Sequence, residues 1–260
     1  MEKYSPERAN DEAMEIQKRA EQLKENRNET GNPKADHYKN AEKSLESEVN
    51  NAPKWDKVYS GNHNEIPWNF EEAPVWFQEI IQSGWVKPGK TLDVGCGLGN
   101  YANYLASNGF DVLGVDFSQK AVETNQKKYH KENLEFKACD ALNLKSLDTK
   151  FDFVLDISLL HHIKPEDRKK YAESLASVTK SGSKVLVCCF SINDEIFDGK
   201  GEFYGPDTDT TTFVLSEDDI RETFKDNFNI EKLEELEYGK LSKFKISGNK
   251  KRHLVFMIRK

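Results

Sequence analysis

The sequence has no long apolar run and no cysteines at a metal-binding or redox spacing. None of its apolar stretches approaches the roughly twenty residues that a membrane-spanning helix requires, and no signal peptide is recognisable at its start. None of the cysteines forms a C-x-x-C motif; they are Cys96, Cys139, Cys188 and Cys189. We therefore expect a soluble, cytoplasmic protein whose thiols are reduced and structural.

Basic residues are in the minority. Lys and Arg together number 38, against 45 Asp and Glu, which gives a formal net charge of −7. This balance provides no general attraction to nucleic acids or acidic membrane surfaces. The chain of 260 residues is long enough for one domain with its own core and an appendage. We expect its partner to be a small-molecule substrate, not a nucleic acid or a membrane.

Residues 1–52 contain little that could build a core. They are charged, poor in aromatic residues and almost free of Val and Ile. Two weak apolar stripes lie on either side of Gly31-Asn32-Pro33 and leave two alternatives open. The segment is a solvated, partly frayed extension, or it is a loose helical pair. Such a pair would pack either on the domain or on another subunit. In the second case the protein would be a homo-oligomer.

Residues 53–260 show a regular alternation of strands and helices. Strands are expected at 91–94, 111–115, 134–138, 151–157, 184–190, 230–236 and 253–258, and helices at 71–83, 100–108, 119–130, 165–178 and 216–226. This order predicts an α/β domain with a doubly wound, mostly parallel sheet that helices cover on both faces. Residues 53–83 are expected to form a lid and a helix. Residues 191–215 are longer than a usual connection, and we expect them to cover the substrate.

The stretch Leu92 to Gly99 is the most informative part of the sequence. It reads L-D-V-G-C-G-L-G, an apolar strand that breaks on three glycines and continues into a helix. Its G-x-G-x-G spacing departs from the G-x-G-x-x-G fingerprint of pyrophosphate binding. Asp93, just before the turn, suits a cationic ligand such as an ammonium group better than a phosphate.

A second acid completes the pattern. Asp116 ends the next strand, 23 residues after Asp93, which is about the distance at which a nucleotide-binding unit places its ribose-binding carboxylate. One acid near an amino group and one near a ribose describe a nucleoside joined to an amino acid, as in S-adenosylmethionine. A doubly wound domain that binds another nucleotide, or none, is the alternative.

On these residues the chain resembles the class I S-adenosylmethionine-dependent methyltransferases, from Trp55 to its C-terminus. The resemblance implies a Rossmann-like sheet of seven strands with an antiparallel C-terminal hairpin strand. It also implies a set of cofactor-binding residues from the lid and the strand ends. They are Trp55, Tyr59, Trp68, Asp93, Gly95, Gly97, Gly99, Asp116, Phe117, Asp140, Ala141 and Asp156.

The lid motif resembles that of methyltransferases that act on thiols, thiopurines or tellurite. The residues are a Trp-x-x-x-Tyr pair, Trp55 and Tyr59, followed by Pro67-Trp68. In those enzymes an acid often follows the Pro-Trp, and here Asn69 replaces it. Aromatic faces suit a sulfonium cation, with each contact worth roughly 0.5–2 kcal/mol. These rings could instead only seal the edge of the sheet.

The end of the fourth strand, from Asp156 to His162, narrows the substrate class. It lacks the Asn/Asp-Pro-Pro-aromatic motif of base-amine methyltransferases and the Pro-Cys nucleophile of cytosine enzymes, which argues against a nucleic-acid substrate. Asp156 and His161 are the candidate catalytic residues. No third ligand accompanies the paired histidines at a known spacing, so no metal site is expected.

We therefore expect methyl transfer by in-line displacement to a small nucleophile, with a thiol as the leading acceptor. An anionic nucleophile would need no strong base, because a dry aromatic pocket would remove its water. Two alternatives remain open. The protein could methylate protein lysines, since Trp-x-x-x-Tyr also precedes such domains, or it could bind the cofactor without catalysis.

Overall fold

The computed structural model describes residues 53–66, 68–69, 72–205, 210–237 and 251–260. The predictions for residues 1–52 and Pro67 lie outside the described residues, as do the first residue of the helix expected at 71–83 and residues 206–209 of the segment expected to cover the substrate. The chain divides into two units, Met1–Trp55 and Asp56–Lys260, and the second contains the predicted sheet.

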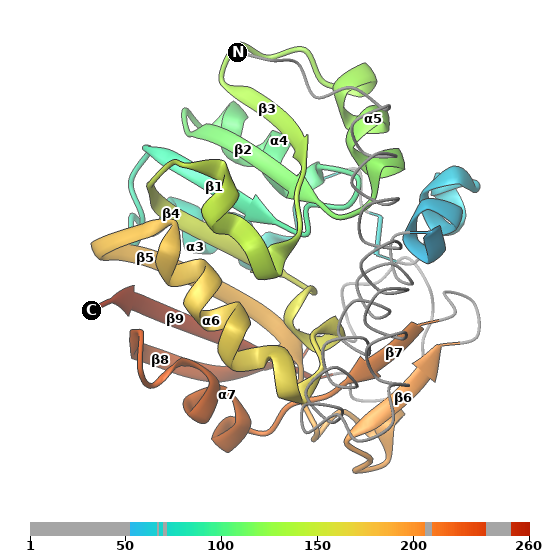
Figure 1. Cartoon of the computed structure of the whole chain (residues 1–260), viewed down its shortest axis with the longest axis vertical. Helices are drawn as coiled ribbons and strands as arrows, with labels where there is room; N and C mark the ends of the chain where they lie inside the picture. Colours follow the sequence, from blue (N-terminus) through green and yellow to red (C-terminus); the bar gives the residue numbers. More distant parts are fainter. Residues whose placement is uncertain (1–52, 67, 70–71, 206–209, 238–250) are drawn as a thin grey trace, which may run out of the picture. The chain divides into compact units, whose positions relative to one another are not determined.

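Seven strands form one sheet in the order β3-β2-β1-β4-β5-β9-β8 (Figure 1). β1 to β5 are parallel, β9 is antiparallel to β5, and β8 is antiparallel to β9. The predicted Rossmann-like architecture is therefore confirmed. The order reverses between β1 and β4, and a sheet of this kind binds its ligand at that point, beyond the carboxyl ends of the strands. The strands are β1 (Lys90–Val94), β2 (Asp111–Asp116), β3 (Leu134–Ala138), β4 (Phe151–Ile157), β5 (Thr179–Phe190), β6 (Glu202–Gly205), β7 (Thr210–Phe213), β8 (Phe228–Glu237) and β9 (Lys251–Arg259).

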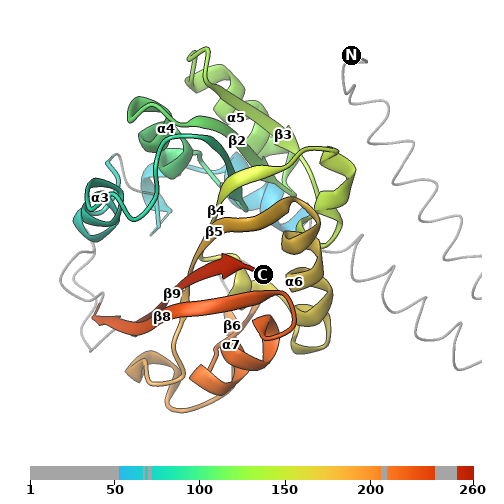
Figure 2. The ribbon, with the colours of Figure 1, turned by 90° about the vertical axis from the view of Figure 1, so that its left-hand side faces the viewer.

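Helices cover both faces of the sheet because each central strand points apolar side chains to both sides. In β5, Val185 and Val187 belong to the core under α6 and α7, whereas Leu186 belongs to the core under α3, α4 and α5. Figure 2 shows α3 and α4 on one side of the sheet and α6 and α7 on the other. Residues 53–60 are also helical. The other helical segments are α3 (Val75–Gln82), α4 (Asn100–Ser107), α5 (Gln119–Lys128), α6 (Arg168–Ser177), α7 (Glu217–Phe224) and the short turns η1 (His63–Glu65), η2 (Ala141–Leu147), η3 (Leu160–His162), η4 (Pro165–Asp167) and η5 (Glu195–Phe197).

Two elements begin four or more residues away from their predicted starts, and the other boundaries differ by smaller amounts. The helix expected at 71–83 begins at Val75, because Pro74 occupies its N-cap and the residue before a proline is driven towards extended backbone. β5 begins at Thr179, five residues before the expected start, because Thr179 pairs with Phe151 before the register shifts. Neither change moves the carboxyl end of a strand.

The long connection at 191–215 contains an antiparallel two-stranded ribbon, β6 and β7, where the sequence predicted no strands. A chain of aromatic rings joins it to the end of β5. The ring centroids of Phe190 and Phe197 are 5.0 Å apart, and those of Phe197 and Phe203 are 5.8 Å apart. Edge-to-face pairs of this kind add to the stability that burial provides. The ribbon is thereby fastened beside the carboxyl end of β5.

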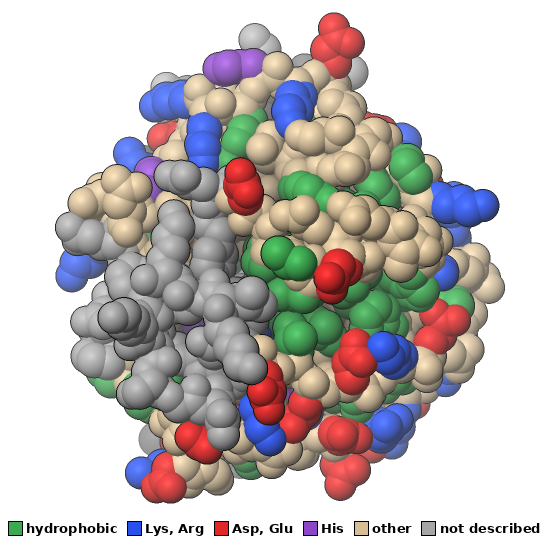
Figure 3. Space-filling view, turned by 180° about the vertical axis from the view of Figure 1, so that it is seen from behind, with side chains coloured by type: hydrophobic (Ala, Val, Ile, Leu, Met, Phe, Trp, Pro, Cys, Tyr) green, Lys and Arg blue, Asp and Glu red, His purple; other side chains and the backbone are tan. Residues whose placement is uncertain are grey.

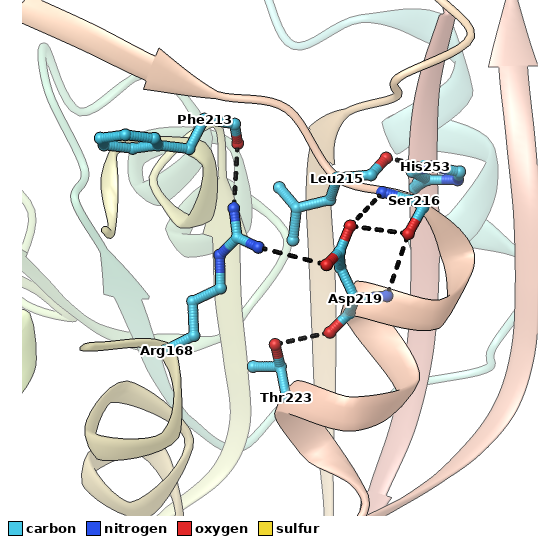
Figure 4. Close-up of polar contacts among 7 residues, drawn as sticks. All are labelled: Arg168, Phe213, Leu215, Ser216, Asp219, Thr223 and His253. Carbon is cyan, nitrogen blue, oxygen red and sulfur yellow. Dashed lines mark hydrogen bonds and ion pairs between the residues drawn. The ribbon is translucent and has the colours of Figure 1, made fainter. Parts of the chain in front are cut away.

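Polar contacts hold the C-terminal end of this insertion (Figure 4). Arg168, in the first turn of α6, donates from Nη2 to the Phe213 carbonyl at 3.4 Å, and its Nη1 lies 3.8 Å from Oδ1 of Asp219 in α7. Nε2 of His253, in β9, bonds to the Leu215 carbonyl at 3.0 Å. The insertion is therefore tied to α6 and to the sheet, and Arg168 also joins α6 to α7.

The surface carries charges of both signs. On the face seen in Figure 3, acidic and basic side chains are mixed and hydrophobic side chains gather near the middle. Within the part of the chain that the structure describes, no helix is both long enough and apolar enough to cross a bilayer.

Candidate active site

The turn after β1 has a conformation that favours glycine. The φ angles of Gly95, Gly97 and Gly99 are 68°, 51° and 71°, in the left-handed region that other residues adopt only with strain. A Cβ atom at Gly97 would lie 2.9 Å from Oη of Tyr59, and one at Gly95 would lie 3.0 Å from Cβ of Leu159. The three glycines thus form a bare backbone turn with close neighbours on two sides.

Asp116, at the end of β2, is bonded to this turn. Its Oδ2 accepts the N–H of Gly97 at 2.8 Å, and its Oδ1 accepts the N–H of Ser118 at 2.9 Å. Burial raises the pKa of Asp116 to about 6, although these backbone donors oppose the rise. A carboxylate has about four lone-pair sites. Its two backbone bonds therefore leave acceptor capacity for ligand hydroxyls.

The predicted lid packs against the same turn. Oδ1 of Asp56 accepts a hydrogen bond from Oγ of Ser118 at 2.5 Å and another from the N–H of Lys120 at 3.1 Å. Tyr59, one helical turn later, is buried beside the glycines and shares a side-chain hydrogen bond with Trp68. The Trp68 side chain is 37% exposed. The lid is therefore anchored by a carboxylate at the start of α5.

Asp93, at the end of β1, has an unsatisfied oxygen. Its side chain is buried, and Oδ2 has no hydrogen-bond partner among the described residues. Desolvation, together with the carboxylates of Asp156 and Asp116, raises the pKa of Asp93 to about 8. A buried polar atom without a partner is costly. This position is therefore suited to a ligand that donates a charged hydrogen bond.

Asp156, near the end of β4, accepts three hydrogen bonds within the protein. Oδ1 accepts the N–H groups of Leu159 at 2.9 Å and Leu160 at 3.3 Å, and Oδ2 accepts the hydroxyl of Tyr171 at 2.7 Å. Burial raises the pKa of Asp156 to about 6, against the effect of these donors. The carboxylate shapes the turn after β4, in which Ser158 has a φ angle of 75°.

The paired histidines that follow are neutral. Burial lowers the pKa of both, that of His162 to about 4. Nδ1 of His161 accepts the N–H of Phe190 at 3.3 Å, so the proton of the neutral ring is on Nε2. His161 therefore has no available lone pair with which to take a proton. His162 bonds to the backbone of Thr211 in the ribbon.

The remaining predicted site residues lie near the same strand ends or in the lid. Asp140 follows β3 and caps η2, where its Oδ1 accepts the N–H of Leu142 at 2.8 Å, and Ala141 beside it is buried. Phe117 follows β2 directly and is half-buried, and Trp55 lies in the helix of residues 53–60. Across the described residues, no three His, Cys, Asp or Glu side chains gather into a metal site.

Comparison with known proteins decides the family. Residues 91–182 match the family model described as a methyltransferase domain. An uncharacterized methyltransferase of Schizosaccharomyces pombe is 35% identical over 102 residues, which cover 38% of this chain and 70% of that protein. The chain belongs to the class I methyltransferases. Its methyl donor is S-adenosylmethionine.

Two further relatives add to this comparison. A protein of Arabidopsis thaliana named probable thiol methyltransferase 2 is 24% identical over 149 residues, 56% of this methyltransferase and 65% of that protein. The structure of an S-adenosylmethionine-dependent methyltransferase from Anabaena variabilis superposes with a TM-score of 0.66. It covers 80% of this chain and 93% of that one at 16% identity, and therefore shows a shared fold.

The site of this methyltransferase fits its cofactor. The unsatisfied oxygen of Asp93 is buried and suits an ammonium group, which is the cationic end of the amino-acid part. The glycine turn has no side chain at its centre, and the added Cβ at Gly97 would meet Tyr59. Asp116 retains acceptor capacity for the ribose hydroxyls. These three features meet at the carboxyl ends of β1 and β2.

Several residues near this site carry no clear signal in the sequence. Asp56 lies inside the lid motif, and Tyr171 falls on a helix whose apolar pattern accounts for it as core. Arg252, at the start of β9, contacts Ser158 and Phe190. It follows Lys250-Lys251 in the sequence, and a run of charges is typical of a solvated surface.

Proposed function

We propose that this methyltransferase acts on a small nucleophile and that a thiol is its leading acceptor. The observation that carries the proposal is the state of the side chains beyond β4. Both oxygens of Asp156 are occupied by donors of the protein, and His161 keeps its proton on Nε2 while Nδ1 is bonded. Both side chains are held in place by these bonds, which favours an acceptor that brings an ionised or easily ionised nucleophile. The name of the Arabidopsis relative supports the same substrate class.

Each group of the cofactor has a proposed partner in the chain. Asp93 would hold the ammonium group, the glycine turn would leave room for the backbone of the amino-acid part, and Asp116 would bind the ribose. Asp140 and Ala141 would contact the adenine. When bound, S-adenosylmethionine supplies a methyl group on a positively charged sulfur. The thiolate gains this methyl group, and the sulfur of the donor becomes a neutral thioether.

The chain contributes positioning and the exclusion of water, not proton transfer. We assign positioning roles to Asp156 and His161, in place of the catalytic roles predicted from the sequence. Asp156 fixes the turn after β4, and His161 orients the end of β5 through the N–H of Phe190. Holding two reactants in line can contribute about 7–11 kcal/mol to the lowering of a barrier.

The lid and the ribbon are proposed to close the two sides of the site. Tyr59 is 5% exposed and lies against the glycine turn, while Trp68 offers an aromatic face that suits a sulfonium. The ribbon covers the histidines through the bond between His162 and Thr211. A thiolate in such a dry site loses the water that lowers its reactivity.

The test is a methyl-transfer assay on a series of thiols whose pKa values differ. Without a protein base, the pH at which kcat/KM reaches half its plateau should follow the pKa of each thiol. Methyl thioethers should appear by mass spectrometry. A profile with one fixed pKa for every thiol would show a protein base. Labelling of protein lysines with no turnover of any thiol would favour the lysine alternative.

A further inference from the structure

A cation lies on the acceptor side of the switch between β1 and β4. Arg252 is directly opposite Phe190 in the antiparallel pairing of β9 with β5. Its guanidinium carbon lies 4.1 Å from the centroid of the Phe190 ring, and its Nη1 donates to Oγ of Ser158 at 2.7 Å. Ring and hydroxyl together fix the plane of the guanidinium and so reduce the entropy that it would lose when a ligand binds.

The contacts of Arg252 connect it to the cofactor turn. Ser158, which accepts its hydrogen bond, is a non-glycine residue with a φ angle of 75°. Backbone strain of this kind persists only where the surroundings enforce it, and it is concentrated at functional sites. The next residue, Leu159, packs on Gly95, where an added Cβ would lie 3.0 Å from the Leu159 side chain. Two adjacent residues therefore separate the guanidinium from the glycine turn.

The charges around the switch are arranged asymmetrically. Asp93, Asp116 and Asp156 are buried at the ends of β1, β2 and β4. Next to Arg252, the ring of His161 lies 4.1 Å from that of Phe190, and this imidazole is neutral. An anionic ligand would be repelled by the carboxylates of Asp116 and Asp156 and attracted by the guanidinium, so it would enter in one orientation.

We propose that Arg252 binds a carboxylate of the acceptor, which makes small carboxylate-bearing thiols the substrate class of this methyltransferase. This inference rests on the proposed thiol methylation. A planar guanidinium matches a carboxylate with two parallel hydrogen bonds, which a point charge such as lysine cannot reproduce. With the carboxylate at Arg252, the thiol end of the molecule is left to face the glycine turn.

The strand itself supplies a matched control. Arg259 is also in β9, its guanidinium carbon lies 5.8 Å from the centroid of the Phe228 ring, and it donates to the Asn227 carbonyl at 2.8 Å. It lies at the other end of the strand, away from the switch. Arg259→Gln therefore removes an arginine of similar local contacts without touching the site.

The experiment compares 3-mercaptopropionate with its amide, which carries the same thiol chain without the charge. We expect the full-length protein to prefer the acid, and Arg252→Gln to reduce the acid-to-amide ratio of kcat/KM about 10- to 100-fold, as for a hydrogen bond to a charged group. Arg252→Lys should recover part of the ratio. Arg259→Gln should leave it unchanged, and the Kd of S-adenosylmethionine should be the same in all variants. Differences in intrinsic thiol reactivity cancel in this ratio of ratios.

A binding measurement separates this inference from the proposed function. The product analogue 3-(methylthio)propionate, titrated by calorimetry into the protein, should bind the wild type and lose affinity in Arg252→Gln. If no thiol is methylated but this binding holds, thiol methylation fails and the carboxylate site stands. An unchanged acid-to-amide ratio and unchanged binding in a folded Arg252→Gln protein would overturn the carboxylate site. Should Arg252→Gln not fold, Arg252→Lys and Ser158→Ala allow the same comparisons.

Discussion

The two halves of the active edge are built in different ways. The cofactor half, at the ends of β1, β2 and β3, consists of bare backbone and of buried carboxylates that lie at the ends of their own strands. The acceptor half, after β4 and β5, combines the ribbon, Arg252 and the paired histidines, which distant segments bring together. A short sequence motif therefore predicts the first half. The second half is formed only by the pairing of β9 with β5, which the motif does not indicate.

The halves also differ in charge. Burial raises the pKa values of Asp93, Asp116 and Asp156 in and beside the cofactor half, and the charges of Asp156 and Asp116 add to the rise at Asp93. In the acceptor half, burial and the Arg252 guanidinium lower the pKa values of His161 and His162. One half thus favours a cation and the other an anion. A reaction between a sulfonium and a thiolate needs both.

The largest expected effect comes from Asp93→Asn. It removes the carboxylate proposed for the ammonium group, and we expect the Kd of S-adenosylmethionine to rise about 10- to 100-fold, as for the loss of a charged hydrogen bond. The melting temperature of the ligand-free variant should not fall. An ionised carboxyl that is buried without a partner does not stabilise the folded state, so its removal costs no stability. Calorimetry and thermal unfolding measure the two quantities. Asp111→Asn, an exposed acid at the start of β2, is the control.

The direction of the stability effect follows from the pKa of Asp93. Folding raises this pKa from 3.8 to about 8. The group therefore stabilises the folded state most below pH 4, and this contribution is lost as the pH rises to 8. Asp93→Asn should flatten that fall in the ligand-free protein. If the variant bound the cofactor as tightly as the wild type, the charge difference between the two halves would have no functional meaning.

The next largest effect comes from a pair of glycine substitutions. They separate the consequence of a close contact with Tyr59 from that of backbone strain alone. Gly97→Ala places a Cβ 2.9 Å from Oη of Tyr59 at a φ angle of 51°. Gly199→Ala, in the insertion, has a φ angle of 68° and no atom within 4 Å of the added Cβ. Strain should cost each variant about 1–2 kcal/mol of unfolding free energy. Only Gly97→Ala should also weaken cofactor binding, measured by calorimetry. Equal cofactor affinity in both variants would argue that the lid is not part of the cofactor half.

Sequence patterns predicted the cofactor half because its information is local. The apolar strand, the glycines and Asp93 lie within eight residues, and the carboxyl end of a parallel strand fixes where they go. The sheet was predicted for the same reason, since strands and helices alternate at regular intervals. A proline moved the start of α3 because its effect on the preceding residue competes with the apolar period.

The acceptor half could not be predicted in the same way. Arg252 and Ser158 are 94 residues apart in sequence. Nothing in a charge run indicates which of its members stacks on an aromatic ring, because the register of β9 against β5 decides it. The ribbon of β6 and β7 lies in a segment rich in Gly, Asp and Thr, which is typical of a loop.

The pH dependence of cofactor binding also tests the difference in charge between the two halves, with a smaller expected effect than the substitutions above. Asp93 is protonated below pH 8 in the ligand-free protein, with Asp116 and Asp156 as its nearest charged neighbours. Binding an ammonium group favours the ionised carboxylate, so a proton must leave. Affinity should fall by up to tenfold for each pH unit below 8. Above pH 8 it should fall again as the amino group itself loses its charge.

Calorimetry in two buffers of different ionisation enthalpy measures that proton directly. Near pH 7 the wild type should release close to one proton per bound cofactor, and Asp93→Asn should release almost none. Release of a proton by Asp93→Asn as well would assign the effect to Asp116 or Asp156, whose pKa values are about 6.

The smallest effects come from two serine caps, one in each half. Oγ of Ser118 accepts the N–H of Ala121 at the start of α5 and donates to Asp56 of the lid. Oγ of Ser216 accepts the N–H of Asp219 at 3.1 Å in a capping box at the start of α7. Replacing either serine by alanine should cost about 1 kcal/mol of unfolding free energy.

The functional consequences of these two equal losses should diverge. Ser118→Ala releases one anchor of the lid and should raise the Kd of S-adenosylmethionine, with little change in the KM of the acceptor. Ser216→Ala loosens the helix that follows the ribbon and should raise the acceptor KM alone. Both quantities come from one set of titrations and initial rates. If both variants changed the Kd of S-adenosylmethionine, or both changed the KM of the acceptor, the packing of the two halves would be coupled. The two halves would then differ in charge but would not respond independently to a loss of packing.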